Sequence, residues 1–338
     1  MKAAVRLAAL LIGLCTGGGG FAQDYPSKPV RVIVPFPPGG LVDISAHLVC
    51  QKLTEFWGRS VVVGNHAGGG GVLGIEAAAK SSPDGYTLLA FSDAYAKIPV
   101  LNTGLPFDPL KDFVGISPLV SPHSVLIVSA STGIDTLSKL IDKAKATPEQ
   151  VSSGFSFGPA TTSHILSEKF KLATGTAFTH TLKKNPNELT NDILAGRITF
   201  SFLSSPHSHI REGKLRALGV TGTRRSNRLP DVPTLAEAGL AGFEHANWTG
   251  LWAPSGTPAD IVDKIAGDVA RALAAPDVRE KAGQLDVELM SMTNAEFMRF
   301  VNAEIDGAAR IVKGLGITPQ AAPAGKPIVS HRPCGGSK

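Results

Sequence analysis

The chain repeats one order of elements, an apolar strand, a loop and an amphipathic helix, and this leaves few folds open to it. Residues 30–34 predict a strand, the loop Pro35–Gly40 ends it, and apolar residues recur at helical spacing over 44–57. The order recurs over 61–80, and a further strand is expected at 86–90. Solidly apolar strands joined by helices are typical of parallel strands buried on both faces. We therefore predict an α/β fold with parallel-type sheets flanked by helices.

A second series of such units follows and predicts a second α/β domain. Its strands are expected at 124–128, 155–157, 198–203 and 216–221, and its helices at 137–146, 163–174 and 187–195. Amphipathic helices at 261–274 and 294–315 come next, and the Pro-, Gly- and Ala-rich residues 319–338 predict a disordered tail. Ligands of open α/β sheets bind beyond the carboxyl ends of the strands, where loop and helix amides favour an anion. Two such domains therefore predict a cleft for a small anion.

Residues 1–22 have the three parts of a secretory signal peptide. Lys2 and Arg6 form a positive segment, and Leu7–Leu14 is a short apolar segment. Gly20-Phe21-Ala22 supplies small residues at the two positions that matter for cleavage. The alternative is a buried N-terminal helix, which the glycine run Gly17–Gly20 would break. We expect cleavage after Ala22 and export of the remaining chain.

The net charge of +5 comes entirely from the two ends of the chain. Residues 1–22 and 319–338 carry five basic residues and no acidic residue, so the body between them is neutral. A neutral body with 6% aromatic residues lacks the basic surface and the stacking rings of a nucleic-acid-binding protein. After export two cysteines remain, and we expect Cys50 to be buried, although a disulfide with Cys334 is possible.

Three motifs are candidates for a cofactor, metal or ligand site. Gly69–Gly74 matches a dinucleotide fingerprint formally, but Gly64–Gly68 intervenes after the strand and no acid lies near position 89, so a loop lining a cleft is preferred. The pair His207-x-His209 has no third ligand at a known spacing, so we predict no metal. No nucleophile–base arrangement is recognisable, so we predict no enzyme and no cofactor. Hydroxyl side chains gather at a strand-to-helix turn, as helix caps or ligand contacts: Ser156, Thr161, Thr162 and Ser163.

Six segments, in order, resemble the Bug family, the TctC-like receptors of tripartite tricarboxylate transporters. The first is YPSKPVRVIVPFPPGG at Tyr25–Gly40, and the match extends to about Ile317. The other segments are PDGYTLL at 83–89, FDPLKDF at 107–113, GKLRAL at 213–218, LPDVPTLAEAG at 229–239 and WTGLWAPSGTP at 248–258. Each segment alone is modest, but together and in order they are highly specific.

The resemblance implies a two-domain periplasmic binding protein (type II, Venus-flytrap) with a hinge of crossover strands. Domain 1 would span 24–124 plus 246–318 and domain 2 would span 125–245. Such receptors capture a small carboxylate between the domains, without chemistry, and pass it to membrane transporter subunits or a sensor protein. We expect a periplasmic monomer with these contacts: Phe36, Gly39, Gly40, Asp43, Ser92, Ser156, Thr161 and Thr162. Asp43 could instead cap the first helix.

Departures from the family pattern bear on the ligand. Leu41-Val42-Asp43 stands where the family has Ser-Thr-Asp, so two hydroxyl groups are replaced by apolar side chains. Ile198–Leu203 lacks the two acids of the family pattern, which argues against an amino-acid ligand. We therefore expect an apolar or aromatic carboxylate. The alternatives are a diverged, sensor-linked receptor and a secreted enzyme that uses the same cleft.

Overall fold

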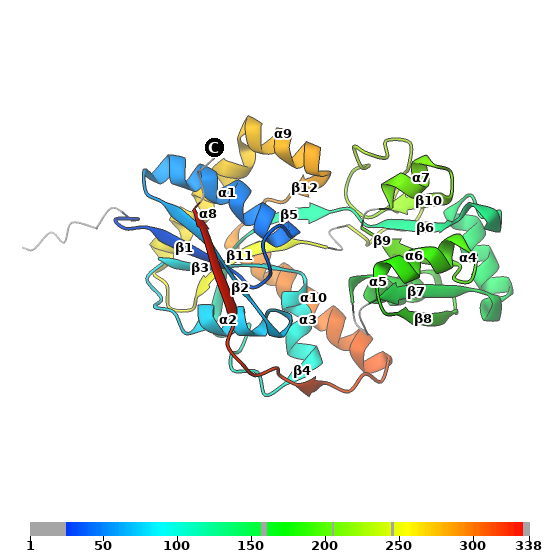
Figure 1. Ribbon diagram of the computed structural model, residues 1–338, viewed down its shortest axis with the longest axis horizontal. Helices are drawn as coiled ribbons and strands as arrows, with labels where there is room; N and C mark the ends of the chain where they lie inside the picture. Colours follow the sequence, from blue (N-terminus) through cyan, green and yellow to red (C-terminus); the bar gives the residue numbers. More distant parts are fainter. Residues whose placement is uncertain (1–24, 157–160, 205, 245–246, 334–338) are drawn as a thin grey trace, which may run out of the picture.

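Strands β1, β2 and β3 form the parallel centre of a seven-stranded sheet in the larger of two lobes (Figure 1). The computed structural model describes residues 25–156, 161–204, 206–244 and 247–333. The predicted signal peptide and its cleavage site lie outside these residues. Within the described ranges, no helix is both long and apolar enough to cross a membrane.

The sheet of the larger lobe, here the large lobe, has the order β12-β5-β11-β3-β1-β2-β14. Its strands are β1 (Val30–Val34), β2 (Val61–Ala67), β3 (Thr87–Ser92), β5 (Phe113–Pro122), β11 (Thr249–Pro254), β12 (Val287–Leu289) and β14 (Ile328–Pro333). The prediction of parallel strands is correct for β1, β2 and β3, but β5, β11, β12 and β14 pair antiparallel. The sheet is therefore mixed, because β5, β11 and β12 enter it from segments that do not repeat the strand–helix order.

Helices cover both faces of this sheet. They are α1 (Leu41–Trp57), α2 (Val72–Ala79), α3 (Ala94–Leu101), α8 (Ala259–Ala274), α9 (Pro276–Leu285) and α10 (Asn294–Gly314). Val32 packs into a core with α1, α8 and α9, whereas its neighbour Ile33 packs into the opposite core with α2, α3 and α10. Neighbouring strand residues face opposite sides, which explains why β1 is apolar at nearly every position.

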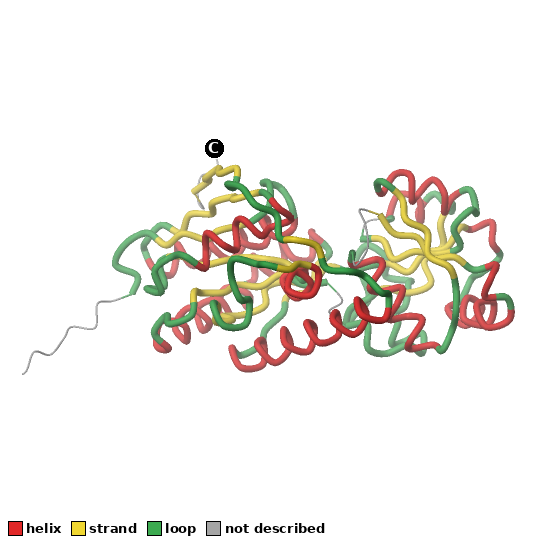
Figure 2. The backbone as a smooth tube through the Cα atoms, turned by 90° about the horizontal axis from the view of Figure 1, so that it is seen from below, coloured by secondary structure: helices red, strands yellow, loops and turns green. Residues whose placement is uncertain are grey.

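The smaller lobe, here the small lobe, has a five-stranded sheet of order β10-β6-β9-β7-β8. Its elements are β6 (Val125–Ser129), α4 (Leu137–Ala146), β7 (Ser152–Ser156), α5 (Thr162–Thr174), β8 (Thr179–Lys183), α6 (Pro186–Leu194), β9 (Phe200–Leu203), α7 (His207–Arg211) and β10 (Leu215–Val220). Single 3-10 turns occur in this lobe at Ala130–Thr132 and Pro148–Gln150, and one occurs in the large lobe at Gly69–Gly71. The chain passes from the large sheet to the small one between Pro122 and Val125, and the two sheets occupy separate halves of the molecule (Figure 2).

The predicted disorder of residues 319–338 is wrong for much of that segment. Gln320–Ala321 forms β13, which pairs with β4 (Asn102–Thr103), and β14 runs antiparallel to β2 from Ile328 opposite Ala67 to Pro333 opposite Val62. The free edge of β2 offers unpaired backbone groups, and β14 satisfies them. Backbone pairing of this kind depends little on composition, so a composition rich in Pro, Gly and Ala did not reveal it.

Candidate functional site

Two neighbouring cavities lie where the lobes meet. The first, of about 770 Å³, is formed mainly by the large lobe, and the second, of about 740 Å³, by the small lobe. Ser204 lines both cavities, and the adjacent residues His123 and Ser124 line one each. The cavities are therefore two parts of one cleft at the passage from β5 to β6.

The predicted contact residues divide between the two cavities. Phe36, Gly39, Gly40 and Ser92 line the first cavity. Ser156, Thr161 and Thr162 line the second. Asp43 lines neither of these two cavities. The fold thus brings seven of the eight predicted residues to one cleft, and contact of each with a ligand stays a prediction.

The loop between β1 and α1 builds the floor of the first cavity. Gly39 has a φ of +88°, a conformation that a residue with a side chain rarely adopts, and Gly40 is the N-cap of α1. The next two residues, Leu41 and Val42, line the cavity with apolar side chains. The N-terminus of this 17-residue helix thus lies at the cleft lining, and helix N-termini favour an anion.

Asp43 holds this loop in shape. The residue is only 4% exposed, and its carboxylate accepts hydrogen bonds from the Gly39 amide (2.9 Å) and from Nδ2 of Asn65 (2.8 Å). The same Asn65 amide group donates to the carbonyl of Phe36 (3.1 Å). Asp43 is the third residue of α1 and reaches back to the residue before the N-cap, which resembles the capping role that was the alternative to ligand contact.

We predict that Asp43→Ala lowers the free energy of unfolding of the large lobe by about 1–3 kcal/mol, because two donors lose their acceptor. Asp43→Asn keeps one acceptor oxygen and is expected to cost less. Urea unfolding followed by tryptophan fluorescence measures the loss. Asp306→Ala, an exposed acid on α10, is the control and should change little. Equal stability of the Asp43→Ala and Asp306→Ala variants would contradict this role for Asp43.

The second cavity is lined by the hydroxyl turn at the start of α5. Thr161 is the N-cap residue of α5, and Thr162 is its first residue. The Thr162 hydroxyl donates to Oδ2 of Asp93 (3.0 Å) and accepts from Nζ of Lys97 (2.9 Å), and Asp93 and Lys97 are also ion-paired. Asp93 and Lys97 belong to the start of α3 in the large lobe, so Thr162 connects the two lobes across the cleft.

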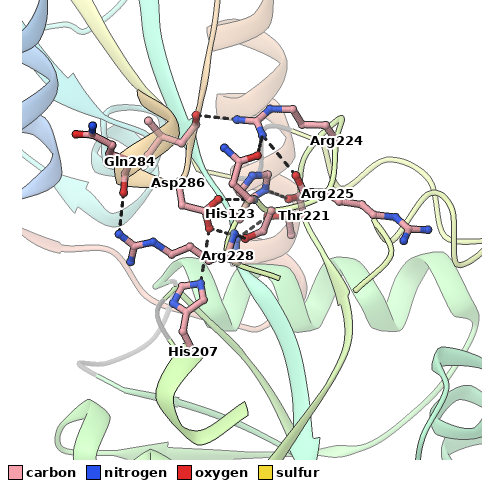
Figure 3. A network of polar contacts seen from close by, with 12 residues as sticks. His123, His207, Thr221, Arg224, Arg225, Arg228, Gln284 and Asp286 are labelled. Carbon is pink, nitrogen blue, oxygen red and sulfur yellow. Dashed lines mark hydrogen bonds and ion pairs between the residues drawn. The ribbon is translucent and has the colours of Figure 1, made fainter. Parts of the chain in front are cut away.

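Several residues of the first cavity were missed from the sequence (Figure 3). His207 on α7 lies 3.6 Å from Oδ2 of Asp286. Oδ2 of Asp286 also accepts from the Ser226 hydroxyl (2.5 Å), and Oδ1 accepts from the backbone N–H of Asn227 (2.8 Å). Burial lowers the pKa of His207. The other missed lining residues include His123, Arg228, Asn247 and Trp248.

Arg228 supplies a positive charge to the first cavity. Its guanidinium donates to the carbonyl of Gln284 at 2.8 Å and leaves further donors for an anion. The basic residues of 224–228 were the available sequence signal, but the partner of Arg228 is 56 positions away. Glu288 accepts from Thr223 and from the Arg224 amide (3.0 Å), so this loop of the small lobe is attached to β12 of the large lobe.

The glycine-rich segment does not line either cavity, contrary to the preferred sequence interpretation. Gly71 has a φ of +103°, and a Cβ atom there would lie 2.5 Å from the ring of Phe91. A Cβ atom on Gly69 would lie 2.9 Å from Pro323 of the C-terminal segment. The glycines therefore allow close packing, and this segment is not placed to bind a dinucleotide in the cleft.

Two α/β lobes with a ligand-sized cleft at the crossover strands define the class of periplasmic binding proteins. The Tripartite tricarboxylate transporter family receptor (TctC) family matches residues 46–317. The chain belongs to this family of non-enzymatic solute receptors.

The relatives include one curated protein and two proteins solved with a bound carboxylate. Protein BugT of Bordetella pertussis is 34% identical over 300 residues, which cover 87% of this chain and 91% of BugT. An R. palustris protein solved with adipate is 30% identical, with a TM-score of 0.67 over 88% of this chain and 100% of that one. MatC from Rhodopseudomonas palustris, solved with bound malate, is 27% identical, with a TM-score of 0.63 over 85% of this chain and 100% of MatC.

Proposed function

We propose that this chain is an extracytoplasmic solute receptor that captures a small carboxylate with an apolar or aromatic body. The observation that carries the proposal is the unequal lining of the cleft. The second cavity presents hydroxyl and amide groups, whereas the first presents Leu41, Val42, Phe36 and Trp248 beside Arg228. Adipate and malate in the two related structures support a carboxylate as the class of ligand.

The apolar wall of the first cavity favours a less polar carboxylate than malate. Val42 is 6% exposed and Trp248 is 1% exposed, so both are packed into the wall of the first cavity and a ligand would contact only their exposed atoms. Neither Leu41 nor Val42 can donate a hydrogen bond from its side chain. A ligand body rich in hydroxyl groups would therefore lose hydrogen bonds to water on this side of the cleft without replacement.

Capture would be a closing motion of two bodies, 24–124 plus 246–318 and 125–245, about the crossover strands. The chain would be exported by its signal peptide, cleaved after Ala22, and act in the periplasm as a monomer. It would pass its ligand to membrane subunits of a tripartite tricarboxylate-type transporter. A receptor that presents the ligand to a sensor protein is the alternative, and neighbouring genes would distinguish the two roles.

We predict that an aromatic or long-chain carboxylate raises the melting temperature of residues 23–338 more than malate does. Ligand at 100 times its Kd adds about 2.7 kcal/mol to the free energy of unfolding. A panel of mono-, di-, tri- and aromatic carboxylates, followed by thermal unfolding of a ligand-free sample, tests this. A folded sample that responds to no carboxylate contradicts the proposal.

The double variant Leu41→Ser, Val42→Thr tests the apolar preference directly. We expect it to weaken binding of the best apolar carboxylate about tenfold, because apolar contact with the ligand is lost. Leu172→Ser, at a side chain that is 72% exposed on α5 and lines neither cavity, is the control and should keep the parent affinity. Unchanged affinity in the double variant would show that the ligand body lies elsewhere.

A further inference from the structure

A second cluster of titratable side chains lies on the small lobe, between α5 and β8. His164 and Glu168 stand four residues apart on α5, and His180 is on the neighbouring strand β8. One nitrogen of each imidazole and one oxygen of the carboxylate all lie within 4.8 Å of one another. None of the three residues is among those that line the two cavities of the cleft.

The donor set suits zinc or a similar divalent transition metal. Zinc takes histidine nitrogen and carboxylate oxygen at about 2.0–2.2 Å, and two histidines with one glutamate form a known three-ligand set. Ligand atoms around one such ion lie about 3.4 Å apart. The ligand atoms here therefore need to move by only about 1 Å, which small side-chain rotations supply.

The His164 imidazole is buried (5% exposed) and the His180 imidazole is half-buried. Burial lowers the pKa of His164 to about 4 and also lowers the pKa of His180. Nε2 of His180 also contacts Oε1 of Glu168 directly, so the two side chains already face each other. The ring of His164 stacks on Phe155 with 3.9 Å between the ring centres, which fixes its orientation.

Lys171 is a cation already placed at this cluster. Its ammonium lies 2.7 Å from Oε1 of Glu168 and 3.2 Å from Nε2 of His180, so it contacts two of the three ligands. A metal ion would have to displace this ammonium and also replace the direct contact between Oε1 of Glu168 and Nε2 of His180. The Lys171 side chain is 27% exposed, and its flexible stem can carry the charge into solvent.

We propose that His164, Glu168 and His180 bind one divalent transition-metal ion of the zinc type, and that Lys171 is the group the ion displaces. The ion would connect α5 to β8. The first turn of α5 carries Thr161 and Thr162 in the second cavity, so metal binding would stabilise the element that positions these hydroxyls. This proposal does not depend on which solute the cleft captures.

Zinc chloride titrated into chelator-treated residues 23–338 tests the proposal, with calorimetry for stoichiometry and affinity and thermal unfolding for stabilisation. One ion is expected to bind and to raise the melting temperature. Glu168→Gln is expected to weaken zinc binding at least tenfold, because the anionic ligand is lost. Lys171→Met removes the competing charge and is expected to tighten binding about tenfold.

The variant Lys171→Met keeps the proposal testable even if Glu168→Gln folds poorly, because a gain in affinity does not arise from misfolding. His47→Ala is the matched control: His47 also lies four residues from an acid, Asp43, but on the large lobe, and its loss should leave zinc binding unchanged. Cobalt in place of zinc should show the visible absorption of a tetrahedral site in the parent chain. This absorption should be lost in Glu168→Gln. Equal zinc affinity in the parent, Glu168→Gln and Lys171→Met chains, or no binding in any of them, overturns the proposal.

Discussion

Replacement of Trp252 by alanine is expected to lower the free energy of unfolding of the large lobe by about 3–5 kcal/mol. Trp252 lies in β11, between β3 and β5 in the middle of the seven-stranded sheet, and is 0% exposed. Its ring stacks on Tyr95 at 4.5 Å between ring centres and contacts Phe297 at 5.2 Å. Removal of the ring would leave a cavity that two covered sheet faces cannot fill by collapse.

The loss is measured by urea unfolding of the parent and variant chains. All three tryptophans of the chain, Trp57, Trp248 and Trp252, lie in the large lobe, so fluorescence reports this lobe alone. Trp252→Phe keeps part of the ring packing and should lose less stability. Leu110→Ala, at a side chain that is 44% exposed, is the control. A Trp252→Ala chain within about 1 kcal/mol of the parent would contradict this account of the core.

Trp252→Ala should also weaken ligand binding in the cleft. The Trp252 ring lies 5.8 Å from that of Trp248, which lines the first cavity. Loss of Trp252 removes support from behind this wall. We therefore expect the variant to bind the carboxylate more weakly than the parent even under conditions in which it remains folded.

Acidification from pH 6.5 to pH 4 is expected to destabilise the small lobe, by up to about 3 kcal/mol from His164 alone. Burial lowers the pKa of His164 to about 4 in the folded chain, against 6.5 in the unfolded chain. Between these values the unfolded chain binds the proton more readily, so unfolding becomes more favourable as pH falls. The stabilising contribution is thus present above pH 6.5 and is lost as pH falls toward 4.

The titratable groups that face His164, namely His180 and Glu168, also make the small lobe less stable as pH falls. Burial lowers the pKa of His180, which therefore also resists protonation in the folded state. Burial alone would raise the pKa of Glu168, but hydrogen bonds from Lys171 and His180 outweigh it and hold this pKa below its ordinary value. Protonation of Glu168 at low pH would therefore add to the loss of stability.

Two optical signals separate the lobes in this experiment. Tryptophan fluorescence follows the large lobe, whereas far-ultraviolet circular dichroism also follows the small lobe. In the presence of a chelator, the circular dichroism midpoint should fall with pH more steeply than the fluorescence midpoint. His164→Phe, which keeps an aromatic ring to stack on Phe155, should flatten this dependence. The same pH dependence in the variant and the parent would exclude His164 as the cause.

The part of the candidate cleft that could be predicted lies where strands end in loops. The Pro35–Gly40 loop and the hydroxyl turn at Thr161 and Thr162 follow buried strands, and both line the cleft. His207 and Arg228 could not be placed this way, because they lie on a short helix and an irregular loop. Their contacts are Asp286 and Gln284, and the second of these is 56 positions from Arg228.

Local patterns account for what could be read without coordinates. Apolar runs and helical spacing located β1, α1, α4 and most other elements within a few residues, because side-chain burial imposes these periods on the chain itself. Local patterns do not determine which remote segments pair or contact each other. Pairing of β14 with β2, the bond from Thr162 to Asp93 across 69 positions, and the meeting of His164, Glu168 and His180 all depend on which surfaces the packed lobes bring together. Such contacts follow from three-dimensional packing, and no local periodicity records them.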